Sequence, residues 1–337
     1  MTHYAEMKND SIQNEKTLLD WAVRLCSDSP RKRVKEWIAA GRFCLDGRVV
    51  TKAGMRLADP GQSLAMGKPE KSAVAWGHRK RIHPKLVLIY LDSDLAIVDK
   101  EAGLLSVPTE NQSKISALEV LSNYLNDARG EATRRSFFGT ADPVKTLPVH
   151  RLDQYTSGLL CIALNDKARQ HLIKQLRSHN FLREYIAYGD GDAATPEGTW
   201  HNYLKLDERG YDQKLFAKPE EGATEAVTHY RVEEVFVKNH VARLHIRLET
   251  GLKHQIRIQA AAHGMPLIGD RIYHPSTQKA VGRKGAQLPY GFKRQALHAA
   301  TIGIIHPTSG KKVKFQSKIP GDMQLLEERL KSPKGEG

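Results

Sequence analysis

The chain has 337 residues and carries 52 Lys and Arg against 38 Asp and Glu, a formal net charge of +14. This length allows about two domains, and a hydrophobic fraction of 40% supports a buried core, which excludes a wholly disordered chain. The surplus of positive charge favours a polyanionic partner, with nucleic acid as the leading candidate. Three cysteines and no long apolar stretch argue against a disulfide framework and a membrane span, so we expect a cytoplasmic protein.

The first predicted unit is a pair of short helices followed by a hairpin. Residues 16–56 hold ten Lys and Arg against four Asp and Glu. Apolar residues keep a helical period on both sides of Pro30, and Gly41 is a natural helix stop. Asp46-Gly47 separates two short apolar runs, and this dipeptide tolerates the positive φ angles of a tight hairpin turn.

This arrangement, with its basic helix and the run from Gly41 to Val50, resembles the S4 RNA-binding domain, with Cys44 and Asp46 where Val and Asn are commoner. The resemblance implies an RNA-binding domain at 16–66. The alternative is that the basic residues form only a solvated helix face. The candidate RNA-binding residues are Arg31, Lys32, Arg33, Lys35, Arg42, Arg48 and Lys52.

A second domain is predicted at 86–325, after a basic, proline-containing linker at 67–85 and before a tail at 326–337. Two apolar runs at 86–90 and 95–98 predict a β-hairpin. Ser116 has the spacing of a capping box before a helix, and Asn165 follows a strand as the N-cap of another. Alternation at 241–250 predicts a half-buried strand, and 253–263 a helix. Strands and helices intermix without a βαβ repeat, so we predict an α+β domain with a mixed, largely antiparallel sheet.

The segment from His150 to Gly158 is a polar loop that enters an apolar strand. Asp153 beside Arg151 is a candidate nucleophile or base, while Thr156, Ser157 and Gly158 suit a tight turn. An aspartate that caps its own turn is the alternative from the residues alone.

This loop matches the His-Arg-Leu-Asp-x-x-Thr-Ser-Gly motif of the RluA-type pseudouridine synthases, in which the aspartate is catalytic. The similarity continues along most of the chain, where several further segments resemble family motifs in family order: 99–108 (Asp-Lys-Glu-Ala-Gly-Leu-Leu-Ser-Val-Pro), 183–187 (Arg-Glu-Tyr-Ile-Ala), 250–257 (Thr-Gly-Leu-Lys-His-Gln-Ile-Arg), 269–273 and 297–299. The resemblance implies isomerisation of uridine to pseudouridine in structured RNA, with ribosomal RNA as the first candidate and transfer RNA as the second.

The same resemblance assigns roles to individual residues. Asp153 is implied to be catalytic, and an ion pair with Arg257 would keep it deprotonated and fix its direction. Tyr185 is implied to pack on the target base, and Arg151 and His150 to support a base flipped out of its stack. The expected substrate-binding residues are His150, Arg151, Thr156, Ser157, Gly158, Arg183, Lys253, His254 and Gln255.

Two departures from the family pattern bear on the choice of target. Leu252 replaces an arginine, and Gln259 replaces a histidine, so we expect both changes to remove polar groups near the cleft. Arg183 stands where lysine is usual, which keeps the charge but changes its geometry.

No cofactor is expected, because the isomerisation is redox-neutral and intramolecular, and no metal is expected, because the spacing of His245, His254 and His263 does not suit a zinc site. We also expect a monomer. Two alternatives remain open: a non-catalytic RNA-binding or ribosome-assembly factor that retains the fold, and an N-glycoside hydrolase that uses Asp153.

Overall fold

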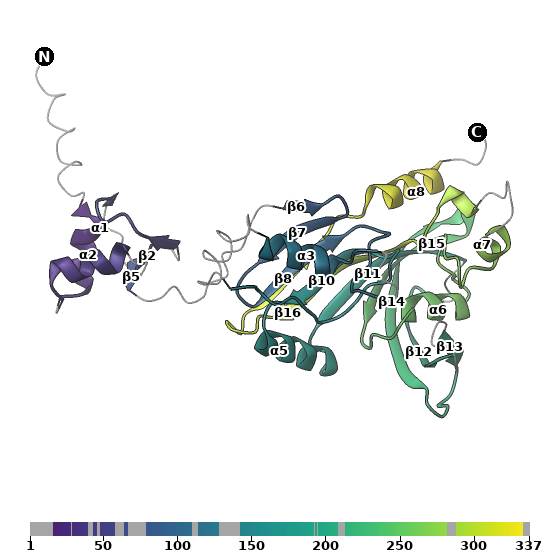
Figure 1. The fold of residues 1–337 in the computed structure, drawn as a ribbon. Coiled ribbons are helices and arrows are strands. Elements are labelled where there is room, and N and C mark those ends of the chain that lie inside the picture. Colours follow the sequence, from purple (N-terminus) through teal and green to yellow (C-terminus); the bar gives the residue numbers. More distant parts are fainter. Residues whose placement is uncertain are drawn as a thin grey trace, which may run out of the picture. The chain divides into compact units, whose positions relative to one another are not determined.

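The computed structural model divides into two compact units, 1–73 and 74–337 (Figure 1). It describes residues 16–27, 29–39, 43–45, 48–57, 64–66, 79–109, 114–127, 142–191, 193, 195–207, 213–281 and 288–332. Among these residues, no helix has the length and apolar character needed to cross a membrane.

The first unit contains the expected helix pair and hairpin. Helices α1 (Leu18–Leu25) and α2 (Arg31–Ala39) pack on each other, and Thr17 with Asp20 forms a capping box at the start of α1. Strand β2 (Phe43–Leu45) pairs with β3 (Arg48–Val50) and with β5 (Leu64–Met66), while β1 (Lys16–Thr17) pairs with β4 (Arg56–Leu57). A small apolar core holds these elements together, namely Leu18, Ala22, Val34, Ile38, Phe43 and Leu64.

The second unit is built on one twelve-stranded sheet. Its strands are β6 (Lys80–His83), β7 (Leu86–Leu91), β8 (Leu95–Lys100), β9 (Leu147–Pro148), β10 (Ser157–Ala163), β11 (Leu182–Asp190), β12 (Glu197–Leu206), β13 (Gln213–Phe216), β14 (Thr224–Phe236), β15 (Val241–Leu248), β16 (Leu297–Ile305) and β17 (Lys312–Gln316).

The predicted mixed, largely antiparallel sheet is confirmed. The strand order is β13-β12-β14-β15-β11-β16-β10-β8-β7-β6, with β17 beside β16 and β9 beside β10. Among the described strands, β10 and β16 form the one parallel pair. The hairpin of β7 and β8 and the strand β15, with Leu244 and Ile246 fully buried, agree with the sequence patterns.

Helices cover the two faces of this sheet differently. The large core unites α3 (Ala117–Asn126) and α6 (Gln255–Ala262) with the face of β11 that carries Tyr185. On the other face, α8 (Gly321–Lys331) packs on Tyr188 of β11. The remaining described helices are α5 (Asp166–Arg177), α7 (Pro275–Ala280) and the 3-10 turns η3 (Val237–Asn239) and η4 (Pro289–Gly291).

Two expected boundaries differ from the structure. The sheet begins with β6, inside the segment predicted to be linker, because its backbone pairs with β7. Helix α8 crosses the predicted start of the tail at 326, because Met323, Leu326 and Leu330 are buried against the sheet. A charged and polar composition hides both segments from a search for apolar runs.

Candidate active site

A cleft of about 450 Å³ opens on the face of the sheet that carries α6. Three segments line most of it: the loop that leads into β10, the first residues of β11, and 248–257 between β15 and α6. These segments are far apart in the sequence, and the sheet order brings β11, β15 and β10 close together. The candidate catalytic residues from the sequence, Asp153, Tyr185 and Arg257, all line this cleft.

Asp153 and Arg257 form the expected ion pair. Arg257 Nη1 donates to Asp153 Oδ2 at 2.9 Å, and the Asp153 side chain remains 20% exposed to the cleft. The opposite edge of the guanidinium donates to Asp270, with Nε to Oδ2 at 2.6 Å and Nη2 to Oδ1 at 2.9 Å. Asp270 is fully buried, so it fixes the orientation in which Arg257 meets Asp153.

The backbone around Asp153 is braced from the loop that follows β8. Ser106 Oγ donates to the Leu152 carbonyl at 2.7 Å and accepts from the Leu152 amide at 3.0 Å. Buried Lys100 donates through Nζ to the carbonyls of Leu104 and Gln154, both at 3.0 Å. These contacts fix the backbone on both sides of Asp153, at Leu152 and Gln154. The ion pair with Arg257 fixes the carboxylate itself.

Two histidines of the cleft are neutral at pH 7. Burial, together with nearby Arg183, lowers the pKa of His150 to about 3, and its Nε2 accepts from the Cys161 amide. His254 has a left-handed backbone with φ of 58° at the N-cap of α6. Burial lowers its pKa to about 4, and its side chain lies between Tyr273, at 3.0 Å, and Asp153, at 3.9 Å.

Tyr185 lies on the cleft side of β11, where a shift in the pairing register with β16 occurs between Glu184 and Tyr185. Tyr185 is buried in the surrounding core, with 5% of its surface exposed. Burial raises the pKa of its phenol, so the hydroxyl stays protonated at neutral pH. A neutral aromatic ring next to a carboxylate and a guanidinium is suited to contact a nucleobase.

The structure separates the other expected substrate-binding residues into three groups. Arg151, Thr156, Arg183 and Lys253 line the cleft. Gln255 also borders it, but its amide braces the 250–255 turn and β14 through bonds with Thr250, the Leu252 amide and the Val227 carbonyl.

Ser157 and Gly158 do not line the cleft, which corrects that expectation. Ser157 Oγ is 3.0 Å from His298 Nδ1 in the core. Gly158 has φ of 115°, and a Cβ there would lie 2.2 Å from the Ala299 carbonyl oxygen, so glycine permits the close pairing of β10 with β16.

The two departures from the family pattern have different locations. Leu252 borders the cleft and packs against the buried cluster of Leu204, Ala226 and Ile258. Gln259 is fully buried, accepts from Thr228 Oγ1 at 2.7 Å and donates to the Trp200 and Ala226 carbonyls. Gln259 therefore does not line the cleft, and its amide joins β12 and β14 inside the core.

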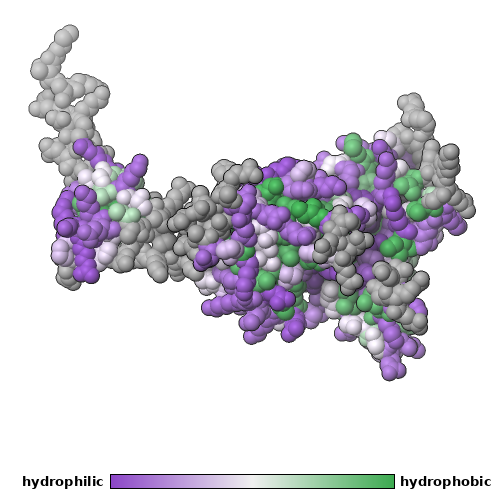
Figure 2. Space-filling model, in the orientation of Figure 1, coloured by the Kyte–Doolittle hydropathy of each residue, from purple (hydrophilic) through white to green (hydrophobic). Residues whose placement is uncertain are grey.

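In the first unit, the basic candidates of α2 lie on its solvent side. Arg31, Lys32, Arg33 and Lys35 are exposed, as is Lys52, and Arg31 pairs with Asp20 at 2.7 Å. Arg48 belongs to β3, but its side chain lies outside the described atoms, and Arg42 lies outside the described residues. Figure 2 shows a mostly hydrophilic surface over α1 and α2.

Sequence reasoning missed three residues that support the site, namely Asp270, Lys100 and Ser106. Each belongs to a segment with the family resemblance, yet nothing in the spacing says that Asp270 holds Arg257 or that Ser106 holds Leu152. The available signal is the occurrence of a charged or polar residue inside an apolar segment, as for Lys100 at the end of β8.

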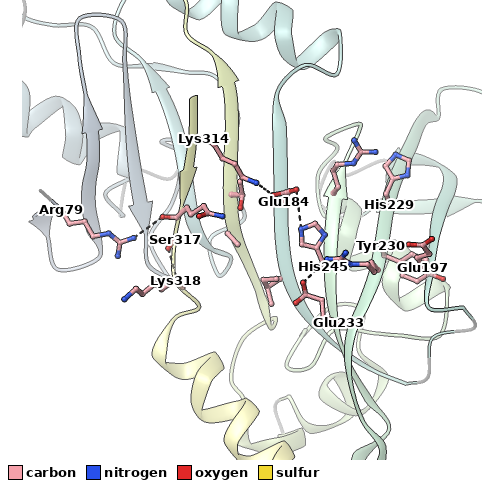
Figure 3. Close-up of a pocket in the computed structure, with 16 residues that line it drawn as sticks. Arg79, Glu184, Glu197, His229, Tyr230, Glu233, His245, Lys314, Ser317 and Lys318 are labelled. Carbon is pink, nitrogen blue, oxygen red and sulfur yellow. Dashed lines mark hydrogen bonds and ion pairs between the residues drawn. The ribbon is translucent and has the colours of Figure 1, made fainter. Parts of the chain in front are cut away.

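A second and larger hollow, of about 1180 Å³, lies on the opposite face of the sheet (Figure 3). Glu184 of β11, His245 of β15 and Lys314 of β17 point into it. Glu184 forms an ion pair with Lys314 at 3.4 Å, and its carboxylate lies 3.7 Å from His245 Nε2. Its charged residues are of both signs, so it offers no uniform field for a polyanion.

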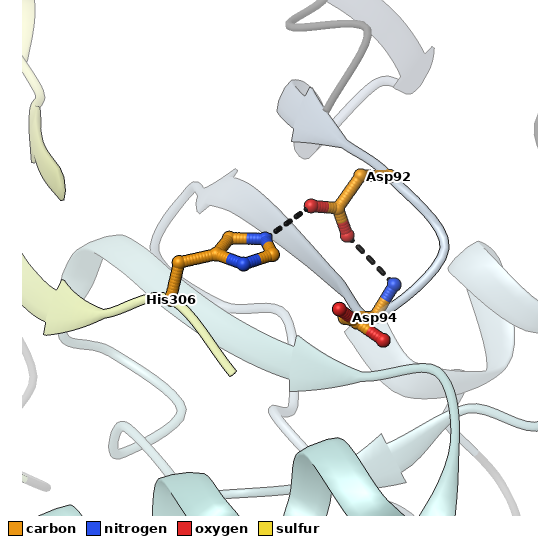
Figure 4. Close-up of side chains that lie close together, drawn as sticks. All are labelled: Asp92, Asp94 and His306. Carbon is orange, nitrogen blue, oxygen red and sulfur yellow. Dashed lines mark hydrogen bonds and ion pairs between the residues drawn. The ribbon is translucent and has the colours of Figure 1, made fainter. Parts of the chain in front are cut away.

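A buried cluster of Asp92, Asp94 and His306 has the composition of a metal site (Figure 4). His306 Nε2 donates to Asp92 at 2.5 Å, and its Nδ1 accepts from backbone amides of residues 308 and 309. Asp92 also accepts from the Asp94 and Leu95 amides, and Asp94 from Asn165 and Thr308. Since protein donors already engage these ligating atoms, we interpret the cluster as a clamp between the β7–β8 turn and the end of β16.

Comparison with known proteins gives consistent results. The family model for RNA pseudouridylate synthase matches residues 94–262, and the S4 domain model matches 17–62. The chain is 32% identical over 314 residues to ribosomal large subunit pseudouridine synthase D of Xanthomonas campestris pv. campestris, covering 92% of this chain and 87% of that protein. Identity to the Escherichia coli protein of the same name is 31% over 320 residues, covering 93% and 90%.

A solved structure supports the fold. Human RNA Pseudouridylate Synthase Domain Containing 4 superposes with a TM-score of 0.54, at 18% identity, over 72% of this chain and 92% of that one. At this identity the likeness concerns the arrangement of the sheet and its helices, and it agrees with the predicted fold class.

Proposed function

The chain belongs to the RNA pseudouridylate synthase family, and from that membership we propose that it converts specific uridines of structured RNA to pseudouridine with Asp153 at the reacting sugar. The observation that carries the proposal is the Asp153 carboxylate, partly exposed in a cleft and held 2.9 Å from a guanidinium that Asp270 locks from behind. A carboxylate with one fixed partner and one free side can approach a substrate without rearrangement.

The reaction requires the C1′–N1 glycosidic bond to break, the uracil to turn, and a C1′–C5 bond to form. C5 loses a proton and N1 gains one, so atoms and charge balance without a co-reactant. Asp153 fits either of two roles, as a nucleophile at C1′ or as a base at C2′. Arg257 positions it in both, because the geometry of the ion pair does not depend on which atom reacts.

The remaining cleft residues fit the handling of an extruded base. Tyr185 offers a buried ring to the uracil, and its protonated hydroxyl can take part in moving the C5 proton. Arg151 is exposed at the mouth, where it can occupy the space that a flipped base leaves, and His150 lies beside it in the cleft. Lys253 and Thr156 add polar contacts at the rim.

Ribosomal RNA is the substrate class that we propose, because the similar proteins are named for the ribosomal large subunit. Transfer RNA is the second candidate. The basic face of α2 would bind phosphates and position the RNA, while the cleft selects the uridine. A monomer that works in the cytoplasm is part of the same proposal.

Tritium release from RNA labelled at uridine C5 tests the chemistry. The wild type and Asp153→Asn are incubated with ribosomal and transfer RNA pools. We expect the wild type to release tritium from at least the ribosomal pool and the variant to release none. The variant should bind RNA as tightly as the wild type does. Glu220→Gln, at an exposed position outside the cleft lining, is the control for loss of one negative charge and should release tritium as the wild type does.

Other results identify the alternatives. If the wild type binds RNA tightly but releases no tritium from either pool, the catalytic proposal fails and a binding or assembly factor takes its place. If free uracil accumulates, the enzyme is an N-glycoside hydrolase that uses the same carboxylate.

Salt dependence tests the role of the first unit. Replacing exposed Lys35 with Gln should lower the magnitude of the slope of log K against log salt by about 1, with a similar loss on every RNA sequence. A slope that does not change would show that this face of α2 makes no phosphate contact.

A further inference from the structure

Arg183 is a buried cation at the cleft for which the described residues provide no ionic partner. It lies on β11 with 8% of its surface exposed, and Nη2 donates to the carbonyls of Glu249 and Thr250, each at 3.1 Å. Its Nε is buried and has no acceptor among the residues that the structure describes. The guanidinium thus meets only backbone dipoles, although a buried charge normally requires an ionic partner.

The carboxylates that border the same cleft are engaged elsewhere. Asp153 pairs with Arg257 at 2.9 Å, Glu225 with His201 at 2.7 Å, and Glu249 with His229 at 2.9 Å. Within the described part of the chain, none of them forms an ion pair with Arg183. Because Nη2 is engaged and Nε is buried, Nη1 is the nitrogen of this permanently charged guanidinium that remains for an anion entering the cleft.

The backbone opposite Arg183 is shaped to hold the guanidinium in place. A Cβ on Gly251 would lie 2.2 Å from Arg183 Nη1, so the glycine allows the 250–252 segment to close over the side chain. Two carbonyl contacts and this packing restrict the side chain before any substrate binds. Because the side chain is already restricted, it loses less conformational entropy when an anion binds.

The position of Arg183 relative to the base site suggests which anion it meets. Arg183 and Tyr185 are two residues apart on one strand, so they share a face and lie roughly 7 Å apart along it. A ring for the uracil and a cation beside it match the base and the phosphate of one nucleotide. With Nη2 engaged by two carbonyls and Nε buried, Nη1 would make the contact to phosphate, as one charge-assisted hydrogen bond.

We propose that Arg183, enclosed by the Gly251 backbone, forms a subsite for the phosphate of the uridine nucleotide that enters the cleft. This inference rests on the proposed function for the identity of the nucleotide. In the free protein, no carboxylate of the described residues neutralises the Arg183 charge. The phosphate of the bound RNA would neutralise it.

Equilibrium binding of uridine 5′-monophosphate and of uridine, measured by saturation-transfer NMR at low salt, tests the subsite. The wild type should bind the monophosphate at least about tenfold more tightly, the scale of one charge-assisted hydrogen bond. Arg183→Gln should bind both compounds equally, and Arg183→Lys should retain part of the preference. The exposed control Lys174→Gln should keep the wild-type ratio.

Gly251→Ala gives an independent test that leaves the arginine in place. The added methyl group forces the guanidinium to move, so the preference for the monophosphate should fall, although the net charge is unchanged. This variant and Arg183→Lys keep the proposal testable if Arg183→Gln fails to fold, which circular dichroism would reveal.

Three results would overturn the subsite: a wild type without preference, an Arg183→Gln variant with the wild-type ratio, or equal weakening of both compounds. Equal weakening would assign Arg183 to the base or to the fold. These assays need no turnover, so a chain that prefers the monophosphate but releases no tritium would refute the proposed function and leave the phosphate subsite standing.

Discussion

Along β11, Arg183 and Tyr185 turn toward the cleft, whereas Glu184 between them turns toward the hollow on the opposite face. On the cleft side, Arg257 is 6% exposed and meets two carboxylates at 2.6 to 2.9 Å. On the other side, Glu184 meets Lys314 at 3.4 Å, and that lysine is 53% exposed.

The difference concerns solvent rather than the number of charges. Water and salt screen the pairs of the hollow, so each contributes little and can rearrange. On the cleft side, Arg257 and Asp270 are enclosed and paired with each other, so their interaction is strong and its direction is determined. Both faces carry charged residues, so charge alone does not identify the site. The two faces differ in how deeply their charged groups are buried.

The largest expected effect comes from removing Asp270. Asp270→Ala would leave Arg257 buried with Asp153 as its remaining carboxylate, and breaking a buried ion pair in this way costs about 3–5 kcal/mol. Denaturant unfolding of both proteins measures the loss. Asp270→Asn preserves the shape and should still lower kcat, because Arg257 loses its orientation. Wild-type stability in the alanine variant would contradict the ranking of the two faces.

The pH dependence of the same residue has a defined sign. Burial opposes ionisation of Asp270, but the hydrogen bonds from Arg257 prevail and lower its pKa below the usual 3.8. Its contribution to stability is therefore present above pH 3.8 and lost as the pH falls through the lowered pKa. Asp270→Asn should remove this part of the acid dependence.

Ser106→Ala tests whether the brace under Asp153 acts on catalysis. The change leaves the buried Leu152 amide without its acceptor, at a cost of about 1–3 kcal/mol. We expect kcat to fall about tenfold to a hundredfold with little change in KM, because the carboxylate loses its position. Ser178→Ala, on an exposed helix end, should leave both constants unchanged. A rise in KM alone would assign the serine to binding.

His306→Gln tests whether a buried pair outside the cleft affects stability without affecting activity. The pair of His306 with Asp92 is buried, and neither residue lines the cleft. The hydrogen bond to Asp92 outweighs burial and raises the pKa of His306 above 6.5. The stabilisation, roughly 2 kcal/mol for a hydrogen bond to a charged group, is thus complete below pH 6.5 and declines as the pH rises through the raised pKa. Thermal unfolding at several pH values measures it, and tritium release per folded molecule should not change.

The smallest effect is expected on the opposite face. Glu184→Gln breaks a pair whose lysine is 53% exposed, so stability should change by about 0–1 kcal/mol and tritium release by less than twofold. The effect should shrink further at high salt. A large loss of activity would mean that the charges of the hollow reach Tyr185 through β11, and the comparison of the two faces would fail.

Local patterns predicted much of this fold. The capping box at Ser116, the N-cap at Asn165 and the alternation in β15 all appear in the structure, because each depends on neighbours within a few residues. Strand β6 and the end of α8 were missed, since their burial depends on partners far along the chain. Gln259 shows the same limit, because nothing near it indicates that its amide joins two buried strands.

By itself, the sequence determined the family, the basic first unit and the three candidate catalytic residues, because motif residues and composition are properties of the chain. The tertiary structure decided which polar groups share the cleft, that Asp270 locks Arg257, and that Ser157, Gly158 and Gln259 serve the core. Among the residues that the structure describes, it also left Arg183 with backbone carbonyls rather than a carboxylate as partners. Burial and pairing between distant strands exist only once the chain has folded, and they set the strength and direction of each charge.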